Sequence, residues 1–198
     1  MENKVVLFIG PSGSGKGTQA KLLLNFLENN DKAKKTIYFE TGKNFRSFIE
    51  GDSFTANLTK RVLDEGDLLP EFLPIWLWTE FLVNKYTGEE NLILDGLTRR
   101  LPEVPVFISA IKFYAIKNPV LLSINVSEKW ARERLLSRGR VDDNEEDIKI
   151  RLAWYFKEVV PAIECFKKDG YFKVIEIDGE ASVEDIHQDI IKKLGYVN

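Results

Sequence analysis

The chain has 198 residues, a length that suits one compact domain with room for an insertion. Apolar residues make up 44% and charged residues 30%, so we expect a packed core and not a disordered chain. The net charge of −3 lacks the basic excess of general nucleic-acid and membrane-surface binders, and we expect neither partner. One cysteine and one histidine exclude an internal disulfide and argue against a zinc site or a histidine-based triad.

The apolar segments are too short or too interrupted to enter a membrane. The longest, residues 68–83, contains two prolines and two glutamates, and the first apolar run covers only residues 5–9. We therefore expect a cytoplasmic protein without a signal peptide. We also expect a monomer whose partners are small molecules.

Strand and helix patterns alternate along most of the chain. Continuous apolar or β-branched runs predict buried strands at 4–10, 36–40, 91–95, 119–126 and 171–177. Helical patterns cover 16–29, 102–117, 128–137, 144–168 and 183–194. Such alternation is typical of βαβ units, so we predict a three-layer α/β fold with a five-stranded parallel sheet and helices on both faces.

Residues 41–86 interrupt this alternation, because they contain no convincing strand. Helices are predicted there at about 44–50, 54–65 and 71–86. We interpret residues 40–69 as a small helical insertion over the sheet edge, and the last of these helices as part of the core. No repeat or flexible linker divides the chain, so residues 1–198 are predicted to form a single domain.

The strongest functional signal is a glycine-rich segment between the first strand and the first helix. Its glycines let backbone N–H groups cradle phosphate oxygens, and the helix N-terminus that follows favours negative charge. Lys16 can reach the β- and γ-phosphates, and a hydroxyl after it can ligate Mg²⁺. In the general pattern the hydroxyl follows the lysine directly, whereas here a glycine intervenes. We predict a P-loop fold and an ATP site formed by Gly13, Ser14, Gly15, Lys16, Gly17 and Thr18.

Four further motifs follow in order. They are T-G-x-x-x-R at 41–46, G-D-L-L-P at 66–70, L-D-G-L-T-R at 94–99, and R-G-R-V-D-D at 138–143 with R-L-x-x-Y at 151–155. Together with G-K-G-T-Q at 15–19, this series resembles the adenylate kinase family, the P-loop kinases of nucleoside monophosphates. The resemblance implies Mg²⁺-dependent, reversible transfer of a phosphoryl group from ATP to AMP, giving two ADP.

The resemblance also implies a role for each matching residue. The catalytic set would be Lys16, Arg99, Arg138, Arg140 and Arg151, with Arg138 and Arg151 bridging the transferred group. Arg134 and Arg138 would also bind ATP, with Arg134 covering the donor adenine. Thr18 and Asp95 would hold Mg²⁺, partly through water. The acceptor site would consist of Thr41, Arg46, Asp67, Leu68, Leu69, Gly96, Arg99, Glu103, Arg140 and Arg151.

The residue chemistry points the same way. The second pKa of a monophosphate is about 6, so the attacking phosphate is already an anion at neutral pH and needs no general base. The reaction instead needs positive charge around crowded anions. Five of the nine arginines lie between residues 132 and 151. Arg134 and Arg138, four apart on a predicted helix, either face an anion or form a solvated basic surface.

Two carboxylates allow a structural as well as a functional interpretation. Asp95 ends a buried strand at the edge where parallel sheets bind ligands, so it either holds Mg²⁺ or caps a turn. Asp143, three residues before a glutamate, forms a D-x-x-E helix-capping pattern. That structural role is as well supported as a catalytic one.

The chain departs from the family pattern around the lid and the acceptor base. Gly139 alone separates Arg138 from Arg140, so residues 137–143 would form a vestigial lid without a zinc module. Glu103 replaces the family's adenine-reading glutamine, and an ionised carboxylate only accepts hydrogen bonds, so we expect relaxed acceptor choice with AMP still favoured. The alternatives are a kinase for GMP, CMP or UMP, or a nucleotide-binding ATPase or regulatory protein.

Overall fold

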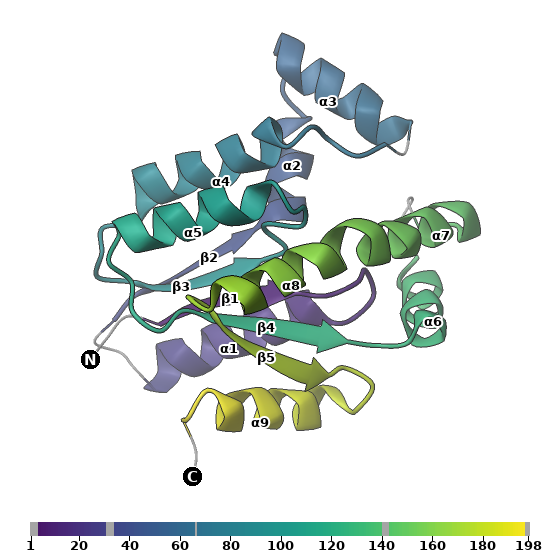
Figure 1. The fold of residues 1–198 in the computed structure, drawn as a ribbon. Helices are drawn as coiled ribbons and strands as arrows, with labels where there is room; N and C mark the ends of the chain where they lie inside the picture. The colour runs from purple at the N-terminus through teal and green to yellow at the C-terminus, as the bar shows by residue number, and fades with distance from the viewer. Residues whose placement is uncertain (1–3, 31–33, 66, 140–142, 197–198) are drawn as a thin grey trace.

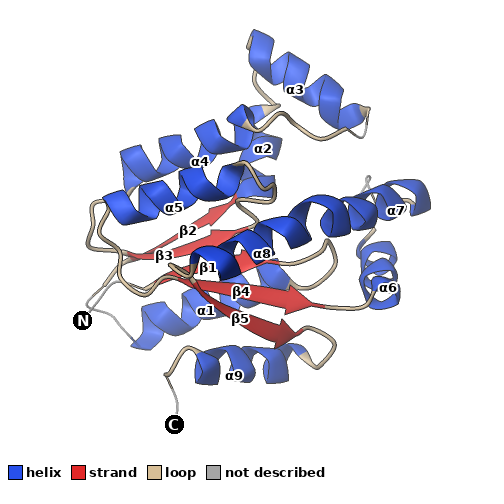
Figure 2. Cartoon of the chain, viewed as in Figure 1, coloured by secondary structure: helices blue, strands red, loops and turns tan. Residues whose placement is uncertain are grey.

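The fold is built around a five-stranded parallel sheet. The computed structural model describes residues 4–30, 34–65, 67–139 and 143–196. The strands lie in the order β2-β3-β1-β4-β5, and every neighbouring pair is parallel (Figure 2). Their bounds are Val5–Ile9 (β1), Thr36–Glu40 (β2), Asn91–Asp95 (β3), Val120–Asn125 (β4) and Lys173–Asp178 (β5). The predicted α/β fold and all five predicted strands are confirmed.

Helices cover both faces of the sheet, which makes three layers (Figure 1). One face packs against α1 (Lys16–Asn30) and α9 (Val183–Lys193), the other against α4 (Phe72–Lys85), α5 (Glu103–Phe113) and α8 (Val160–Asp169). Successive side chains of a strand point to opposite faces. In β1, Val6 and Phe8 therefore join the first cluster, while Leu7 and Ile9 join the second. Burial on both faces explains why β1 and β3 are apolar throughout their central residues.

Two helices of the predicted insertion follow β2. They are α2 (Thr41–Phe48), which starts where β2 ends, and α3 (Phe54–Asp64), which stands away from the sheet in Figure 1. The predicted start of α2, at residue 44, is three residues late because threonine and glycine at its true start have low helix propensity. In α3, the Ser53 side chain accepts from the Ala56 N–H, a standard N-cap.

The segment predicted as one helix over 144–168 contains a widened turn. It comprises α7 (Glu145–Trp154), a π-helical turn (Tyr155–Val159) and α8, and follows α6 (Glu128–Arg138). A proline inside a helix lacks an N–H and collides with the carbonyl four residues earlier. Pro161 lies at the first turn of α8, and the π turn just before it relieves that collision.

The N-cap of α7 is Asn144, whose Oδ1 accepts from the Asp147 N–H at 2.9 Å. The interpretation of Asp143 as this cap is therefore wrong, and its carboxylate is engaged elsewhere. Within the described segments, none of the helices is long and apolar enough to cross a membrane. The predicted vestigial lid includes residues 140–142, which lie outside the described residues.

Candidate active site

The phosphate loop connects β1 to α1 at the carboxyl edge of the sheet. Gly13 and Gly15 have φ angles of +85° and +84°, a region that side chains other than glycine rarely adopt. A Cβ at Gly10 would lie 2.5 Å from the Ile124 carbonyl oxygen, so the loop also packs closely against β4. The buried Ser14 hydroxyl has no hydrogen-bond partner among the described residues. The loop has the backbone shape of an anion cradle.

Lys16 opens α1 and folds back over this loop. Its Nζ donates to the Pro11 carbonyl oxygen at 3.0 Å, which places the ammonium at the mouth of the loop. Burial lowers the pKa of Lys16 to about 8, against the opposing effect of Asp95 and with a contribution from Arg99 and Arg138. At neutral pH the ammonium is still mostly charged, and phosphate oxygens beside it would raise its pKa and offer it further hydrogen-bond acceptors.

Asp95 lies at the end of β3, against the first turn of α1. Its carboxyl accepts from the Tyr38 hydroxyl at 3.1 Å, and burial raises the pKa of Asp95 while Lys16 and Arg99 oppose that rise. A Cβ at Gly17 would lie only 3.2 Å from Asp95 Oδ2. The glycine that separates Lys16 from Thr18 therefore leaves room for this carboxylate.

The donor set at this point suits Mg²⁺. A buried carboxylate from Asp95 and a hydroxyl from Thr18, one residue beyond the close approach at Gly17, are the hard oxygen ligands that Mg²⁺ prefers. Magnesium is held by few protein groups because substrate phosphates and waters complete its shell. In the described part of the chain, no three His, Cys, Asp or Glu side chains gather as a metal-binding group.

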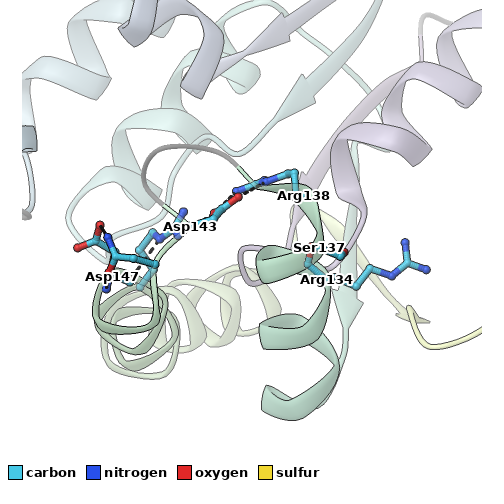
Figure 3. Close-up of polar contacts among 7 residues, drawn as sticks. Arg134, Ser137, Arg138, Asp143 and Asp147 are labelled. Carbon is cyan, nitrogen blue, oxygen red and sulfur yellow. Dashed lines mark hydrogen bonds and ion pairs between the residues drawn. The ribbon is translucent and has the colours of Figure 1, made fainter.

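Two of the predicted catalytic arginines meet on one carboxylate, and Figure 3 shows the contact between Arg138 and Asp143. Asp143, whose side chain is fully buried, accepts from Arg138 Nε at 2.8 Å and Nη2 at 2.7 Å. Arg151 Nη2 donates to the same carboxylate at 2.9 Å. The bidentate pair fixes the plane of the Arg138 guanidinium, and the shared oxygen sets its position relative to Arg151. The structure thus brings Arg138 and Arg151 together across α6 and α7.

Arg134 does not converge with Arg138, although both lie on α6. Its guanidinium lies over the Trp130 ring, 5.1 Å from the ring centroid, and Figure 3 shows it pointing away from Arg138. Trp130 and Arg134 are four residues apart, the spacing at which side chains on one helix face meet. The expected anion between the two arginines therefore finds no site between their guanidinium groups.

Arg99 lies after β3, on the short segment that starts with Gly96. Its Nε donates to the Gly96 carbonyl oxygen at 2.7 Å. Gly96 has a φ of +73°, and a Cβ there would collide with the Arg99 guanidinium. Thr98 has a φ of +54°, which a proline, fixed near −65°, cannot adopt. With threonine in place of the family's proline, the backbone at this position therefore adopts a conformation that the proline could not.

The acceptor-side residues of α2 are less constrained. The buried Thr41 hydroxyl has no hydrogen-bond partner among the described residues. Arg46 is exposed, and its Nη2 lies 3.1 Å from Glu40 Oε1. Neither Glu40 nor Tyr38 belongs to the predicted site. The register of β2 against β3 could have identified them, because Glu40 pairs with Asp95 at the carboxyl ends of these adjacent strands.

Glu103, the first residue of α5, is only 2% exposed. One carboxylate oxygen accepts from the Arg100 N–H at 3.1 Å, while Oε2 has no partner among the described residues. Burial raises the pKa of Glu103 to about 7, against the opposing effects of Arg99 and Arg100. Arg100 also reaches the Leu69 carbonyl oxygen at 3.4 Å, which links Glu103 to the end of the predicted insertion.

Three predicted acceptor residues follow α3, and one predicted catalytic residue cannot be placed. Asp67, Leu68 and Leu69 form an irregular segment between α3 and α4, in which the Asp67 N–H donates to the Val62 carbonyl oxygen. Arg140 lies outside the described residues. Of the predicted catalytic set, Arg99 and Arg138 both contribute to lowering the pKa of Lys16, and Arg151 is linked to Arg138 through Asp143.

Comparison with known proteins gives this arrangement a family. The adenylate kinase family model matches residues 8–171. An adenylate kinase of Prochlorococcus marinus strain MIT 9515 is 32% identical over 193 residues, covering 96% of this chain and 98% of that protein. Adenylate kinases of Corynebacterium urealyticum and Leptospira biflexa are each 31% identical, over 92% and 96% of this chain and 94% and 100% of their own lengths. These matches confirm the resemblance carried by the motifs, and the chain therefore belongs to the adenylate kinase family and is a nucleoside monophosphate kinase.

Proposed function

We propose that this chain transfers the γ-phosphoryl group of ATP, with Mg²⁺, reversibly to AMP. The observation that carries the proposal is the position of Lys16, at the mouth of the phosphate loop and close to Asp95, Arg99 and Arg138. Phosphoryl transfer between two anions depends on such preorganised charge more than on proton transfer.

The donor side is assigned to the loop and to α6. Backbone amides of residues 13–18 and Lys16 would bind the triphosphate, and Thr18 and Asp95 would hold Mg²⁺. The ion, when bound, supplies charge neutralisation at the β- and γ-phosphates. Arg134, whose guanidinium stacks over the Trp130 ring, would lie over the donor base.

The acceptor side is assigned to residues 40–69 and to the segment after β3. Arg46 and Arg99, together with Arg140, would bind the acceptor phosphate, while Arg138 and Arg151 bridge the transferred group. Thr41, Gly96, Glu103 and the segment Asp67, Leu68 and Leu69 would line the acceptor nucleoside. The buried unpartnered atoms of Thr41 and Glu103 support this assignment, because buried polar groups are normally satisfied and a bound nucleoside can supply the missing partners.

A broader acceptor range is favoured by Glu103. When it is protonated it can donate and accept, as an amide does for adenine; when ionised it only accepts, which suits the two donors on guanine. With its pKa at about 7, both forms are present near neutral pH. AMP remains the main acceptor in this proposal, and GMP is the second.

The direct test is to incubate the protein with Mg·ATP and AMP, GMP, CMP or UMP separately at pH 6 and pH 8, and to quantify each diphosphate. We expect ADP to form fastest from AMP, with the ratio of AMP to GMP turnover higher at pH 6. Release of inorganic phosphate with one ADP per ATP consumed, and with no diphosphate formed from the monophosphate, would support an ATPase instead. An acceptor ratio that does not change with pH would contradict the role of Glu103 at the base.

A further inference from the structure

Glu40 lies where the acceptor side meets the donor side. It is the last residue of β2 and immediately precedes α2, and its backbone carbonyl accepts from Asn44 Nδ2 at 2.8 Å. Its Oε1 contacts Arg46 at 3.1 Å, and its Oε2 lies 3.4 Å from the Tyr38 hydroxyl. The same hydroxyl contacts Asp95 at 3.1 Å. A second carboxylate thus stands beside the one assigned to Mg²⁺.

Arg46 is held in a folded-back position by this contact. It lies in the last turn of α2, yet its guanidinium returns to the first residue before the helix. A Cβ at Gly42 would lie 3.2 Å from Arg46 Nη1, so the absence of a side chain at Gly42 leaves room for the Arg46 guanidinium. The Arg46 side chain is 55% exposed and the Glu40 side chain 21% exposed, so Arg46 remains accessible to a ligand.

A carboxylate and a phosphate present similar oxygen pairs to a guanidinium, so the two anions compete for one arginine. A phosphate that approaches Arg46 must displace Glu40 or accept its negative charge nearby. The Tyr38 hydroxyl lies between Glu40 and Asp95, and its single proton can turn from Asp95 to a Glu40 carboxylate that has lost Arg46.

We propose that Glu40 determines the affinity for the acceptor, by occupying Arg46 in the empty site and competing with the acceptor's phosphate. This inference rests on the proposed role of Arg46 at that phosphate. Glu40 weakens the binding of the monophosphate, and it keeps the exposed guanidinium paired until the acceptor arrives. The acceptor site of this chain is thus restrained by a negative charge of its own.

The test is a double-mutant cycle with Glu40→Gln, Arg46→Ala and both changes, with AMP binding measured by calorimetry in the absence of ATP. The glutamine retains the shape of Glu40 and one acceptor for Arg46 but removes the charge. We expect Glu40→Gln to lower the Kd for AMP roughly three- to tenfold, the effect of one partly screened charge. The steady-state KM for AMP should fall in parallel, with a much smaller change in kcat and in the KM for ATP.

Arg46→Ala should raise the Kd for AMP, and in its background Glu40→Gln should no longer tighten binding. Glu50→Gln removes the same charge from the exposed residue two positions after α2 and serves as the matched control. An unchanged or weaker affinity in Glu40→Gln overturns the proposal while the role of Arg46 stands. The same gain with and without Arg46 also overturns it, because the charge then acts without the arginine. No effect of Arg46→Ala overturns both assignments.

Discussion

The donor and acceptor halves of the site differ in how their charged groups are held. In the proposed donor half, Lys16 is hydrogen-bonded to the phosphate loop, and Arg138 shares the buried carboxylate of Asp143 with Arg151, the second arginine proposed to bridge the transferred group. These contacts fix cations before any nucleotide arrives, so little reorganisation is needed when the phosphates bind.

The residues proposed for the acceptor half are held more loosely. Arg46 is exposed and paired with Glu40, and the buried Glu103 has an oxygen without a partner in the described structure. The Thr41 hydroxyl is also buried without one. The difference fits the proposed roles: the cations of the donor half are preorganised, whereas the acceptor half has buried polar atoms that a bound nucleotide could satisfy. Three substitutions test this contrast.

The largest effect is expected from Lys16→Ala. Removing one preorganised charge from a transition-state site typically costs on the order of 10²–10³ in rate. We expect a fall of that size in kcat, measured as ADP formation from Mg·ATP and AMP, because the Lys16 ammonium is the charge that is hydrogen-bonded to the loop itself. Lys21→Ala removes a charge from an exposed position of the same helix and should keep normal activity. Retention of more than about a tenth of the activity by folded Lys16→Ala would contradict the donor-half assignment.

The second effect concerns stability in the acceptor half. Burial raises the pKa of Glu103 from 4.5 to about 7, so between these pH values the folded state binds more protons than the unfolded state. The free energy of unfolding must therefore fall as pH rises through that window and level off above pH 7. Glu103→Gln removes this penalty and keeps the acceptor for the Arg100 N–H.

We expect the stability gain of Glu103→Gln over the parent to be about 2–3 kcal/mol larger at pH 8 than at pH 5. Urea unfolding at the two pH values measures it, and Glu133→Gln, an exposed change on α6, provides the control. A pH-independent difference between Glu103→Gln and the parent would mean that Glu103 is already solvated, and that the acceptor half is not strained in the way described.

The two halves also differ in how well the sequence predicts them. The phosphate loop, Lys16 and Asp95 were predictable, because their chemistry depends on adjacent residues and on the end of a buried strand. The same local logic predicted the five strands. It misplaced the start of α2, where Thr41 and Gly42 are poor helix formers, and it missed the π turn, whose cause is the position of Pro161 within a continuous helical pattern.

What the sequence could not predict are contacts between side chains on different elements. Asp143 matches a capping pattern, yet Asn144 takes the cap and frees Asp143 for two arginines. Arg134 and Arg138 share a helix face, but each is drawn to a different neighbour, Trp130 and Asp143. The pairing of Glu40 with Arg46 arises because α2 begins at the residue directly after β2, and the register of the sheet alone does not predict this contact.

The smallest of the three effects is expected from Asp143→Asn, which sharpens the contrast by loosening the donor half without removing a cation. An amide cannot accept the Arg138 fork with both of its ends, because one end is itself a donor. Arg138 and Arg151 would remain present and charged, but their planes and spacing would no longer be fixed by one carboxylate. We expect kcat to fall roughly tenfold, since a misplaced charge stabilises the transition state less than a fixed one. The KM for AMP should change much less.

The control for Asp143→Asn is Glu146→Gln, an exposed position in the first turn of α7. Because the Asp143 carboxylate is fully buried beside two guanidinium groups, its loss should also lower the free energy of unfolding, by about 1–3 kcal/mol. That stability cost alone does not reduce the turnover of protein that remains folded, so kcat is measured well below the unfolding temperature. If Asp143→Asn keeps kcat within twofold while losing stability, the carboxylate only stabilises the fold. The phosphate loop, and not the pairing of Arg138 and Arg151 with Asp143, would then position the charges needed for phosphoryl transfer.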